Sequence, residues 1–311
     1  MRALVTGASG FIGRHLVAHL RKVEDEVIAS DRTGLSGADL ADLDQARRLV
    51  AGARPEVVYH LAGYSDVGGS WGDPEGAFRA NATATLCLLL AAREADVGRV
   101  LVASSADVYG DVAGGTLPVT EECQLRPLSP YAASKVAAEY LALQAHLGAH
   151  LATVRVRLFN QLGPGQSDRF VVPALARQIA DAERSGKAEV EVGNLTPRRD
   201  FTDVRDSVKA LHLVAREGTP GEVYNLCSGT DHCVQDVAES LLALAHRPMT
   251  LKVDPARIRP VDLPVLVGDA TRLQAVTGWE PAIPLAQTLS DVLEEWRGRL
   301  TSTAPSSPAP S

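Results

Sequence analysis

Tyr131 and Lys135 carry the strongest chemical signal in this 311-residue sequence. They lie four residues apart in a segment with a helical pattern, 131–147, so the two side chains face the same way, and Pro130 fits the start of that helix. A free tyrosine has a pKa of about 10, but a neighbouring ammonium favours the phenolate. Tyr131 could therefore exchange a proton with a hydroxyl or carbonyl oxygen. Alone, the two residues could equally form a surface pair.

Ser105 could act on the same oxygen. It lies just beyond an apolar strand, 100–102, at the carboxyl end where ligands bind in parallel sheets. Its hydroxyl would hydrogen-bond the oxygen that exchanges a proton with Tyr131.

A glycine-rich turn, Thr6-Gly7-Ala8-Ser9-Gly10-Phe11-Ile12-Gly13, joins the first strand to the first helix with GxxGxxG spacing. In this context the glycines allow a tight turn, close approach to a pyrophosphate and close helix–sheet packing, and the helix N-terminus offers free N–H groups. The alternative is a glycine-rich turn without a ligand. We expect cofactor contacts from Gly7, Ser9, Gly10, Phe11, Ile12 and Gly13.

Asp31 ends the second strand, near the spacing expected for the acid that binds the adenosine ribose. A carboxylate there would repel a 2′-phosphate, which favours NAD, but the adjacent Arg32 could accommodate that phosphate, so NADP stays open. The alternative for Asp31 is a solvated turn residue. Asp39-Leu40 could place a carboxylate near the adenine amine, or Asp39 could cap a helix.

The elements that position these residues alternate in the first half of the chain. Apolar strands are predicted at 3–5, 27–29, 57–59, 100–102 and 151–156, and helices at 11–22, 43–51, 77–95 and 131–147. Strands that are apolar throughout, separated by helices, indicate a parallel sheet covered on both faces. We therefore predict an α/β fold with a doubly wound parallel sheet, the Rossmann architecture.

After about residue 160 the alternation breaks, and a smaller, interleaved C-terminal substrate lobe is predicted. Helices are expected at 172–185, 204–216, 234–245 and 285–300, and strands at 190–193 and 223–226. We assign residues 1–160, with returning segments near 195–232, to the nucleotide-binding domain. Residues 161–194 and 233–300 are assigned to the substrate lobe. The Ser/Pro/Ala-rich tail, 301–311, is expected to be disordered.

Composition narrows the function classes. The net charge is −7 and 45% of residues are hydrophobic, which indicates a globular protein without non-specific nucleic-acid binding. No apolar run is long enough to cross a membrane, and no signal peptide precedes the glycine turn. The four cysteines lack CxxC spacing and the histidines lack metal-ligand spacing, so we expect a cytoplasmic protein with reduced cysteines and no metal. His60 and the three tryptophans are expected to be packing residues.

The ordered motifs resemble those of the extended short-chain dehydrogenase/reductases, the NAD-dependent epimerases and dehydratases that act on nucleotide sugars. The matching stretches are the glycine turn, His60-Leu61-Ala62-Gly63, Ser104-Ser105-Ala106-Asp107-Val108-Tyr109-Gly110, Ser129-Pro130-Tyr131-Ala132-Ala133-Ser134-Lys135 and Arg157-Leu158-Phe159-Asn160. The resemblance implies a Ser-Tyr-Lys catalytic set, cofactor contacts from Leu61, Ala62, Gly63, Leu158, Tyr131 and Lys135, and a homodimer.

Further stretches are similar to those of GDP-4-keto-6-deoxy-mannose reductases: 159–166, 170–173, 192–195 followed by 199–206, 224–229 and 259–264. This similarity implies a GDP-sugar substrate. Arg199 and Arg259 fall where such enzymes hold the diphosphate, although each could instead form a surface salt bridge. Asn160 could bond the sugar or the phosphate, and Phe170-Val171-Val172 could form a wall for the base or ordinary core.

Asp107 bears on the type of reaction. Similar dehydratases use an acidic residue here to abstract the C5 proton, but the Asp-Glu pair of one dehydratase class is Ala106-Asp107 in this chain, and an Asp is one methylene shorter than the Glu of another. Asp107 could also cap a turn. We favour reduction of a C4 keto group by hydride transfer from NAD(P)H, with Tyr131 as proton donor. An NAD-retaining 4-epimerase or 4,6-dehydratase is the alternative, and a non-catalytic NAD-binding sensor or scaffold is a remote one.

Overall fold

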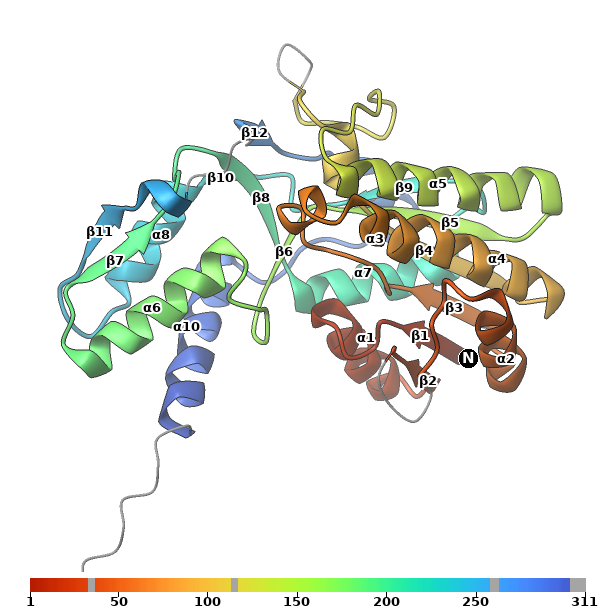
Figure 1. The fold of residues 1–311 in the computed structure, drawn as a ribbon, viewed down its shortest axis with the longest axis horizontal. Coiled ribbons are helices and arrows are strands. Elements are labelled where there is room, and N and C mark those ends of the chain that lie inside the picture. The colour runs from red at the N-terminus through yellow and green to blue at the C-terminus, as the bar shows by residue number, and fades with distance from the viewer. Residues whose placement is uncertain (33–36, 113–116, 258–262, 303–311) are drawn as a thin grey trace, which may run out of the picture.

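The computed structural model describes residues 1–32, 37–112, 117–257 and 263–302, so the candidate Arg259 lies outside the described residues. A six-stranded parallel sheet forms the centre of the nucleotide-binding side, with strand order β2-β1-β3-β4-β5-β9 (Figure 1). Its strands are β1 (Arg2–Thr6), β2 (Glu26–Ser30), β3 (Val57–His60), β4 (Arg99–Ser105), β5 (Thr153–Leu158) and β9 (Val223–Leu226). The predicted doubly wound α/β architecture is confirmed.

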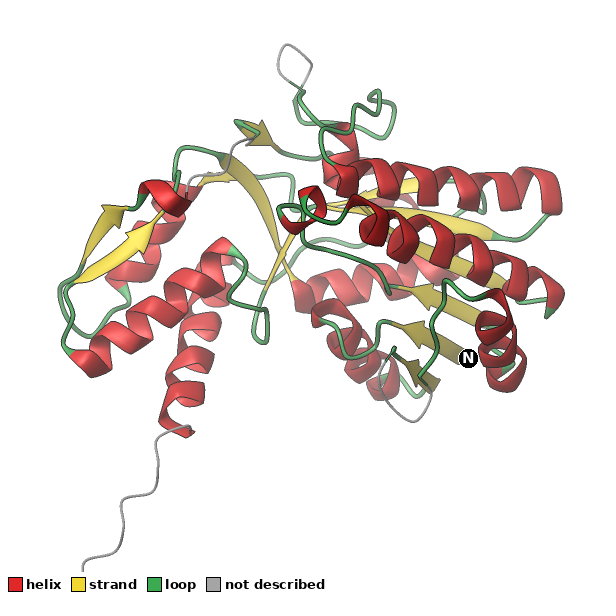
Figure 2. Ribbon diagram, viewed as in Figure 1, coloured by secondary structure: helices red, strands yellow, loops and turns green. Residues whose placement is uncertain are grey.

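Helices cover both faces of this sheet because its strands are apolar on both sides (Figure 2). One face packs against α1 (Phe11–Lys22), α7 (Val204–Glu217) and α9 (Thr271–Thr277). The other packs against α2 (Leu43–Ala53), α4 (Ala84–Glu94) and α5 (Pro130–Ala149). The carboxyl ends of β1, β3, β4 and β5 therefore converge on one edge, where ligands bind in such folds.

A second core lies beside the sheet and is built from α6 (Val171–Ser185), α8 (Val234–Ala243), α10 (Leu285–Ser302) and β7 (Glu189–Val192), which pairs with β11 (Thr250–Val253). The strand β8 (Arg198–Asp203) pairs with β6 (Asn160–Leu162), β10 (Asp231–Cys233) and β12 (Val265–Leu266). In Figure 1 this second lobe stands to the left of the parallel sheet.

The lobe boundaries predicted from the sequence stay a prediction, and we propose one refinement. Leu266, Ala270, Leu273 and Trp279 pack in the core that adjoins the parallel sheet. We therefore place residues 263–279 with the nucleotide-binding side.

Two elements differ from expectation. The predicted helix 77–95 is divided into α3 (Pro74–Phe78), a π-helical turn (Arg79–Thr83) and α4. Within this turn the Asn81 side chain bonds to Tyr64 and Ser134, and the Thr85 hydroxyl donates to the Asn81 carbonyl. Single π-helical turns of this kind are frequent at functional sites. The predicted disordered tail begins too early, because α10 continues through Ser302, and residues 303–311 lie outside the described residues.

Candidate active site

An open cleft of about 1120 Å³ lies between the carboxyl edge of the sheet and the second lobe. Its lining includes the glycine turn, the ends of β3, β4 and β5, the start of α5, and residues of β8 and α6. A cavity of this size exceeds the usual volume for one small ligand, so it can accommodate a dinucleotide and a nucleotide sugar together.

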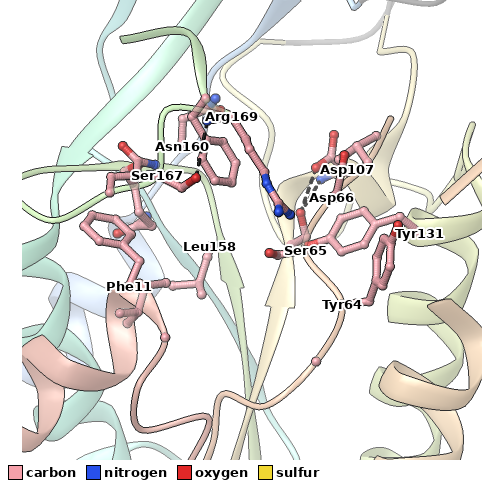
Figure 3. Close-up of a pocket in the computed structure, with 18 of the residues that line it drawn as sticks. Phe11, Tyr64, Ser65, Asp66, Asp107, Tyr131, Leu158, Asn160, Ser167 and Arg169 are labelled. Carbon is pink, nitrogen blue, oxygen red and sulfur yellow. Dashed lines mark hydrogen bonds between the residues drawn. The ribbon is translucent and has the colours of Figure 1, made fainter. Parts of the chain in front are cut away.

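The predicted catalytic residues meet in this cleft (Figure 3). Ser105 is the last residue of β4, and its hydroxyl donates to Asp107 Oδ2 at 2.9 Å while it accepts from the Asp107 N–H at 3.2 Å. Tyr131 lies in the first turn of α5, which Ser129 caps by accepting from Ala132 N. Lys135, one turn later, donates from Nζ to the Ala103 carbonyl at 3.0 Å.

Burial sets the charge state of these groups. The pKa of Tyr131 is raised above its ordinary value, first because burial disfavours the phenolate and then because the Asp107 charge repels it, while a hydrogen bond with Ser105 opposes the shift. Burial lowers the pKa of Lys135 to about 8, and the Glu139 charge opposes that shift. The expected lowering of the Tyr131 pKa by Lys135 is therefore not the dominant effect, and Tyr131 is a neutral phenol at neutral pH.

Asp107 contacts Ser105 through two groups: its carboxylate accepts the Ser105 hydroxyl hydrogen, and its backbone N–H donates to the same hydroxyl. Ser105 caps the 3₁₀ helix Ala106–Tyr109 by accepting from Asp107 N. Asp107 therefore orients the Ser105 hydroxyl.

The glycine turn has the shape that a pyrophosphate requires. Gly7 has φ +69°, and a Cβ there would lie 2.7 Å from the Ala62 nitrogen. A Cβ on Gly13 would lie 2.0 Å from the Gly7 carbonyl oxygen. Gly10 caps α1 without a side-chain bond, so the helix N-terminus faces the cleft unobstructed by a capping side chain. Side chains at Gly7 and Gly13 would clash with backbone atoms, so the tight turn and its close packing against α1 and the end of β3 require glycine, as in dinucleotide-binding turns.

Asp31 lies at the edge of this turn, and its Oδ2 accepts a hydrogen bond from Ser9 N. Arg32, Asp39 and Leu40 also line the cleft. Asp39 does not cap a helix, because Asp42 caps α2 by accepting from Gln45 N. The Asp39 carboxylate instead pairs with Arg79 at 2.6 Å, and this hydrogen bond lowers the pKa of Asp39.

The remaining predicted cofactor contacts line the same cleft. Leu61, Ala62 and Gly63 come directly after β3, and Leu158 is the last residue of β5. Phe11 and Ile12 are the first two residues of α1. Figure 3 shows Phe11 and Leu158 on the same side of the cleft.

The described substrate candidates come from the second lobe. Asn160 begins β6, Val171 begins α6 with 38% of its surface exposed, and Arg199 lies on β8. Arg199 donates to the Leu263 carbonyl at 2.6 Å, whereas the neighbouring Asp200 is buried and accepts from Ser228. Of the two acids that the sequence offers as salt-bridge partners for the candidate arginines, Asp200 is bonded to Ser228, and Asp262 lies outside the described residues.

Sequence reasoning missed several cleft residues. Tyr64, Ser65 and Asp66 follow β3, and the Arg169 side chain extends from the second lobe toward Asp66 and Asp107 (Figure 3). These residues show no regular spacing in the sequence, because they come together only when the two lobes fold against each other.

The packing expectation is wrong for Trp71, which is 59% exposed and lines the cleft, but correct for Trp279 and Trp296, which are buried. It is confirmed for His60, which bonds to Thr6 and Thr85 and whose pKa is lowered to about 3 by burial and then by Lys135.

The four cysteines are free thiols. Within residues 1–32, 37–112, 117–257 and 263–302, no helix is long and apolar enough to cross a membrane, and no group of three or more His, Cys, Asp or Glu side chains could hold a metal ion.

Comparisons with known proteins agree with this geometry. Residues 3–227 match the NAD dependent epimerase/dehydratase family. The chain is 37% identical to the GDP-6-deoxy-D-mannose reductase of Pseudomonas aeruginosa, over 96% of this chain and 98% of that protein. A solved structure of RMD from Pseudomonas aeruginosa complexed with NADPH has a TM-score of 0.88 and 35% identity, and covers 96% of this chain and 100% of that one. Thermus thermophilus UDP-glucose 4-epimerase, in complex with NAD, has a TM-score of 0.87 and 29% identity, with coverage of 96% and 99%.

Proposed function

Because this chain belongs to the NAD dependent epimerase/dehydratase family, we propose that it is a nucleotide-sugar reductase that acts on the C4 keto group of a GDP-4-keto-6-deoxy-hexose. Its similarity to the Pseudomonas aeruginosa reductase over nearly the whole of both chains supports this substrate class. When bound, the reduced nicotinamide supplies the hydride. The glycine turn, Asp31 and the ends of β3 and β5 would hold that dinucleotide.

The meeting of Ser105, Tyr131 and Lys135 in the cleft is the observation that carries the proposal. Reduction of a ketone requires a proton for the developing alkoxide, and a phenol held protonated in a buried site can donate it. Ser105 would hydrogen-bond the same oxygen, so that two donors stabilise the charge as it develops. The Lys135 ammonium, in the turn after Tyr131, would hold the cofactor ribose and stabilise the phenolate left after proton donation.

Asp107 gives less support to the alternative reactions. A 4,6-dehydratase would need a carboxylate directed to C5 of the sugar, but Asp107 accepts the Ser105 hydroxyl hydrogen at 2.9 Å. An epimerase would retain its cofactor through the cycle, so net oxidation of reduced nicotinamide distinguishes a reductase from an epimerase. A sensor or scaffold would not need the Ser105, Tyr131 and Lys135 set that meets in the cleft.

We also propose a role for each remaining candidate. Arg199 and Arg259 bind the diphosphate, Val171 packs against the base, and Asn160 bonds the sugar or phosphate. Asp31 favours NADH, although the Pseudomonas aeruginosa structure holds NADPH.

We propose that the protein is a cytoplasmic homodimer. The exposed apolar side chains Leu86 on α4 and Tyr140 and Leu147 on α5 support pairing of these helices with a second copy. The oligomeric state in solution, measured by light scattering, tests this assignment.

The direct test of function is the absorbance of reduced nicotinamide in the presence of GDP-4-keto-6-deoxy-mannose. We expect one equivalent of NADH or NADPH to be oxidised per sugar reduced, with the product identified by NMR. Tyr131→Phe should lower kcat by about 10²–10⁴-fold and leave cofactor affinity intact. Absence of oxidation by the wild-type protein would reject the reaction, and normal turnover by the variant would reject the role of Tyr131.

A further inference from the structure

Glu139 occupies an unusual position behind the catalytic residues. It follows Tyr131 and Lys135 by one further helical turn, so all three lie on the same face of α5. Its surface exposure is 0%. A carboxylate is rarely buried to this extent unless other groups compensate its charge.

The compensating groups come from the two strands beneath the helix. Ser104 on β4 donates its hydroxyl hydrogen to Glu139 Oε1, and Arg157 on β5 donates to both carboxylate oxygens, at 2.8 Å from Nη2 to Oε2 and 3.0 Å from Nε to Oε1. Arg157 also donates to the Tyr109 hydroxyl at 2.9 Å. Glu139 is therefore bonded to the strand that ends in Ser105 and to the strand that ends in Leu158.

We propose that Glu139 is a positioning residue of the active site: its carboxylate holds α5 against β4 and β5 and stabilises the buried Lys135 ammonium. The proposal rests on the proposed function, since it describes how the same site is kept ready for proton and hydride transfer. Glu139 acts through Lys135 and touches neither sugar nor nicotinamide.

The charges around Lys135 explain why this carboxylate matters. Glu139 on α5 and His60 on β3 interact electrostatically with Lys135. Glu139 in turn faces Arg155 and Arg157 on β5, and Tyr131 faces Asp107 after β4. His60 is neutral near pH 7, so it adds no charge beside Lys135. Glu139 is the charge that raises the pKa of Lys135 against the effect of burial.

The arrangement of charges predicts the direction in which the pH dependence of activity should change. Lys135, with a pKa of about 8, is an ammonium below that pH and loses its charge above it. Activity that needs the ammonium should therefore fall on the alkaline side. Removal of the Glu139 charge lowers the pKa of Lys135 further, so this fall should move to lower pH.

The test compares the wild-type enzyme with Glu139→Gln, which keeps the shape and removes the charge. We expect the alkaline limb of the kcat/KM profile for the keto sugar to move down by about one pH unit, a loss of roughly fivefold at pH 8. Glu121→Gln is the matched control, because Glu121 is also buried, at 4% side-chain exposure, but pairs with Arg272. Its alkaline limb should stay in place.

A structural role alone would give a different result. A lower melting temperature and uniformly lower activity, with the alkaline limb unmoved, would overturn the proposal, as would an equal shift in Glu121→Gln. If Glu139→Gln does not fold because Arg157 is left unpaired, the double variant Glu139→Gln/Arg157→Met leaves no lone charge. Because the loss of the Arg157 cation opposes the loss of the Glu139 anion, its alkaline limb should move down by less than in Glu139→Gln, and a limb that does not move down would overturn the proposal.

A second readout separates this proposal from the proposed function. The pKa of Lys135 can be measured without substrate, by NMR of protein with labelled lysine side chains. We expect it to fall in Glu139→Gln and not in Glu121→Gln, whatever sugar the enzyme uses. An unchanged Lys135 pKa would overturn the proposal even if the reductase activity is established.

Discussion

The carboxylate of Asp31 should decide which dinucleotide the enzyme uses. It is held at the edge of the glycine turn by a hydrogen bond from Ser9 N, beside the expected position of the adenosine ribose. Asp31→Asn keeps an oxygen for Ser9 and removes the charge. We expect the variant to gain activity with NADPH and to lose activity with NADH.

The magnitude follows from the charges. A 2′-phosphate carries about −1.5 to −2 charges, and each charge pair at about 4–5 Å in water is worth about 1 kcal/mol, so its repulsion by Asp31 is about 1.5–2 kcal/mol. Asp31 is half-buried, which makes the aqueous value a lower bound. Replacing a charge-assisted hydrogen bond to the ribose by a neutral one costs NADH about 1 kcal/mol. The ratio of kcat/KM values, NADPH over NADH, should rise roughly fiftyfold or more.

The assay is the initial rate of reduced-nicotinamide oxidation with each cofactor at a fixed concentration of keto sugar. Asp66→Asn is the control, because it removes a carboxylate from the same cleft near Tyr131 and Asp107, away from the ribose (Figure 3). A change of less than threefold in the cofactor ratio of Asp31→Asn, or an equal change in Asp66→Asn, would refute the reasoning.

Three further experiments test other parts of the site and the core. Gly13→Ala places a Cβ 2.0 Å from a backbone oxygen, so it should cost about 1–3 kcal/mol of stability and abolish most cofactor binding. Gly52→Ala, which has open space around its Cβ, should change neither property. Urea unfolding measures the stability, and nicotinamide fluorescence measures cofactor binding. Trp279→Ala should cost about 3–5 kcal/mol of stability in the same unfolding assay, because the indole is buried. Trp71→Ala should cost under about 1 kcal/mol, because Trp71 is exposed, and should raise the KM for the sugar nucleotide, because Trp71 lines the cleft. Arg199→Gln should raise that KM roughly tenfold or more without changing the KM for the cofactor, and equal effects on both would contradict diphosphate binding.

The parallel sheet could be predicted because its strands are buried on both faces and therefore read as short, continuous apolar runs. The strand β8 could not, since its sequence Arg-Arg-Asp-Phe-Thr-Asp is mostly charged or polar. It is stabilised by partners from distant parts of the chain, β6, β10 and β12, whose own segments are only two or three residues long. Pairing of this kind leaves no periodic pattern in the sequence.

The candidate site likewise contains residues whose positions could be predicted from the sequence and residues whose positions could not. The glycine turn and the Tyr131–Lys135 spacing are local features, so their positions in the cleft could be predicted. The exposure of Trp71 depends on how the short helix Gly69–Trp71 meets α5, where Ser70 accepts a hydrogen bond from Tyr131 N. Arg169 reaches the cleft only because a second lobe stands opposite the sheet. Neither arrangement is encoded within a window of neighbouring residues.

The contacts between α7 and the C-terminal segment determine the order in which parts of the protein can fold during synthesis. Asp206, near the start of α7, accepts hydrogen bonds from Ala282 N and Ile283 N at 2.8 and 2.7 Å, and its carbonyl accepts from the Trp279 indole. These partners leave the ribosome more than 70 residues after Asp206. The nascent chain can thus form most of its dinucleotide cradle early, because the first five strands are already complete, but the opposite wall of the cleft must wait for the last helix.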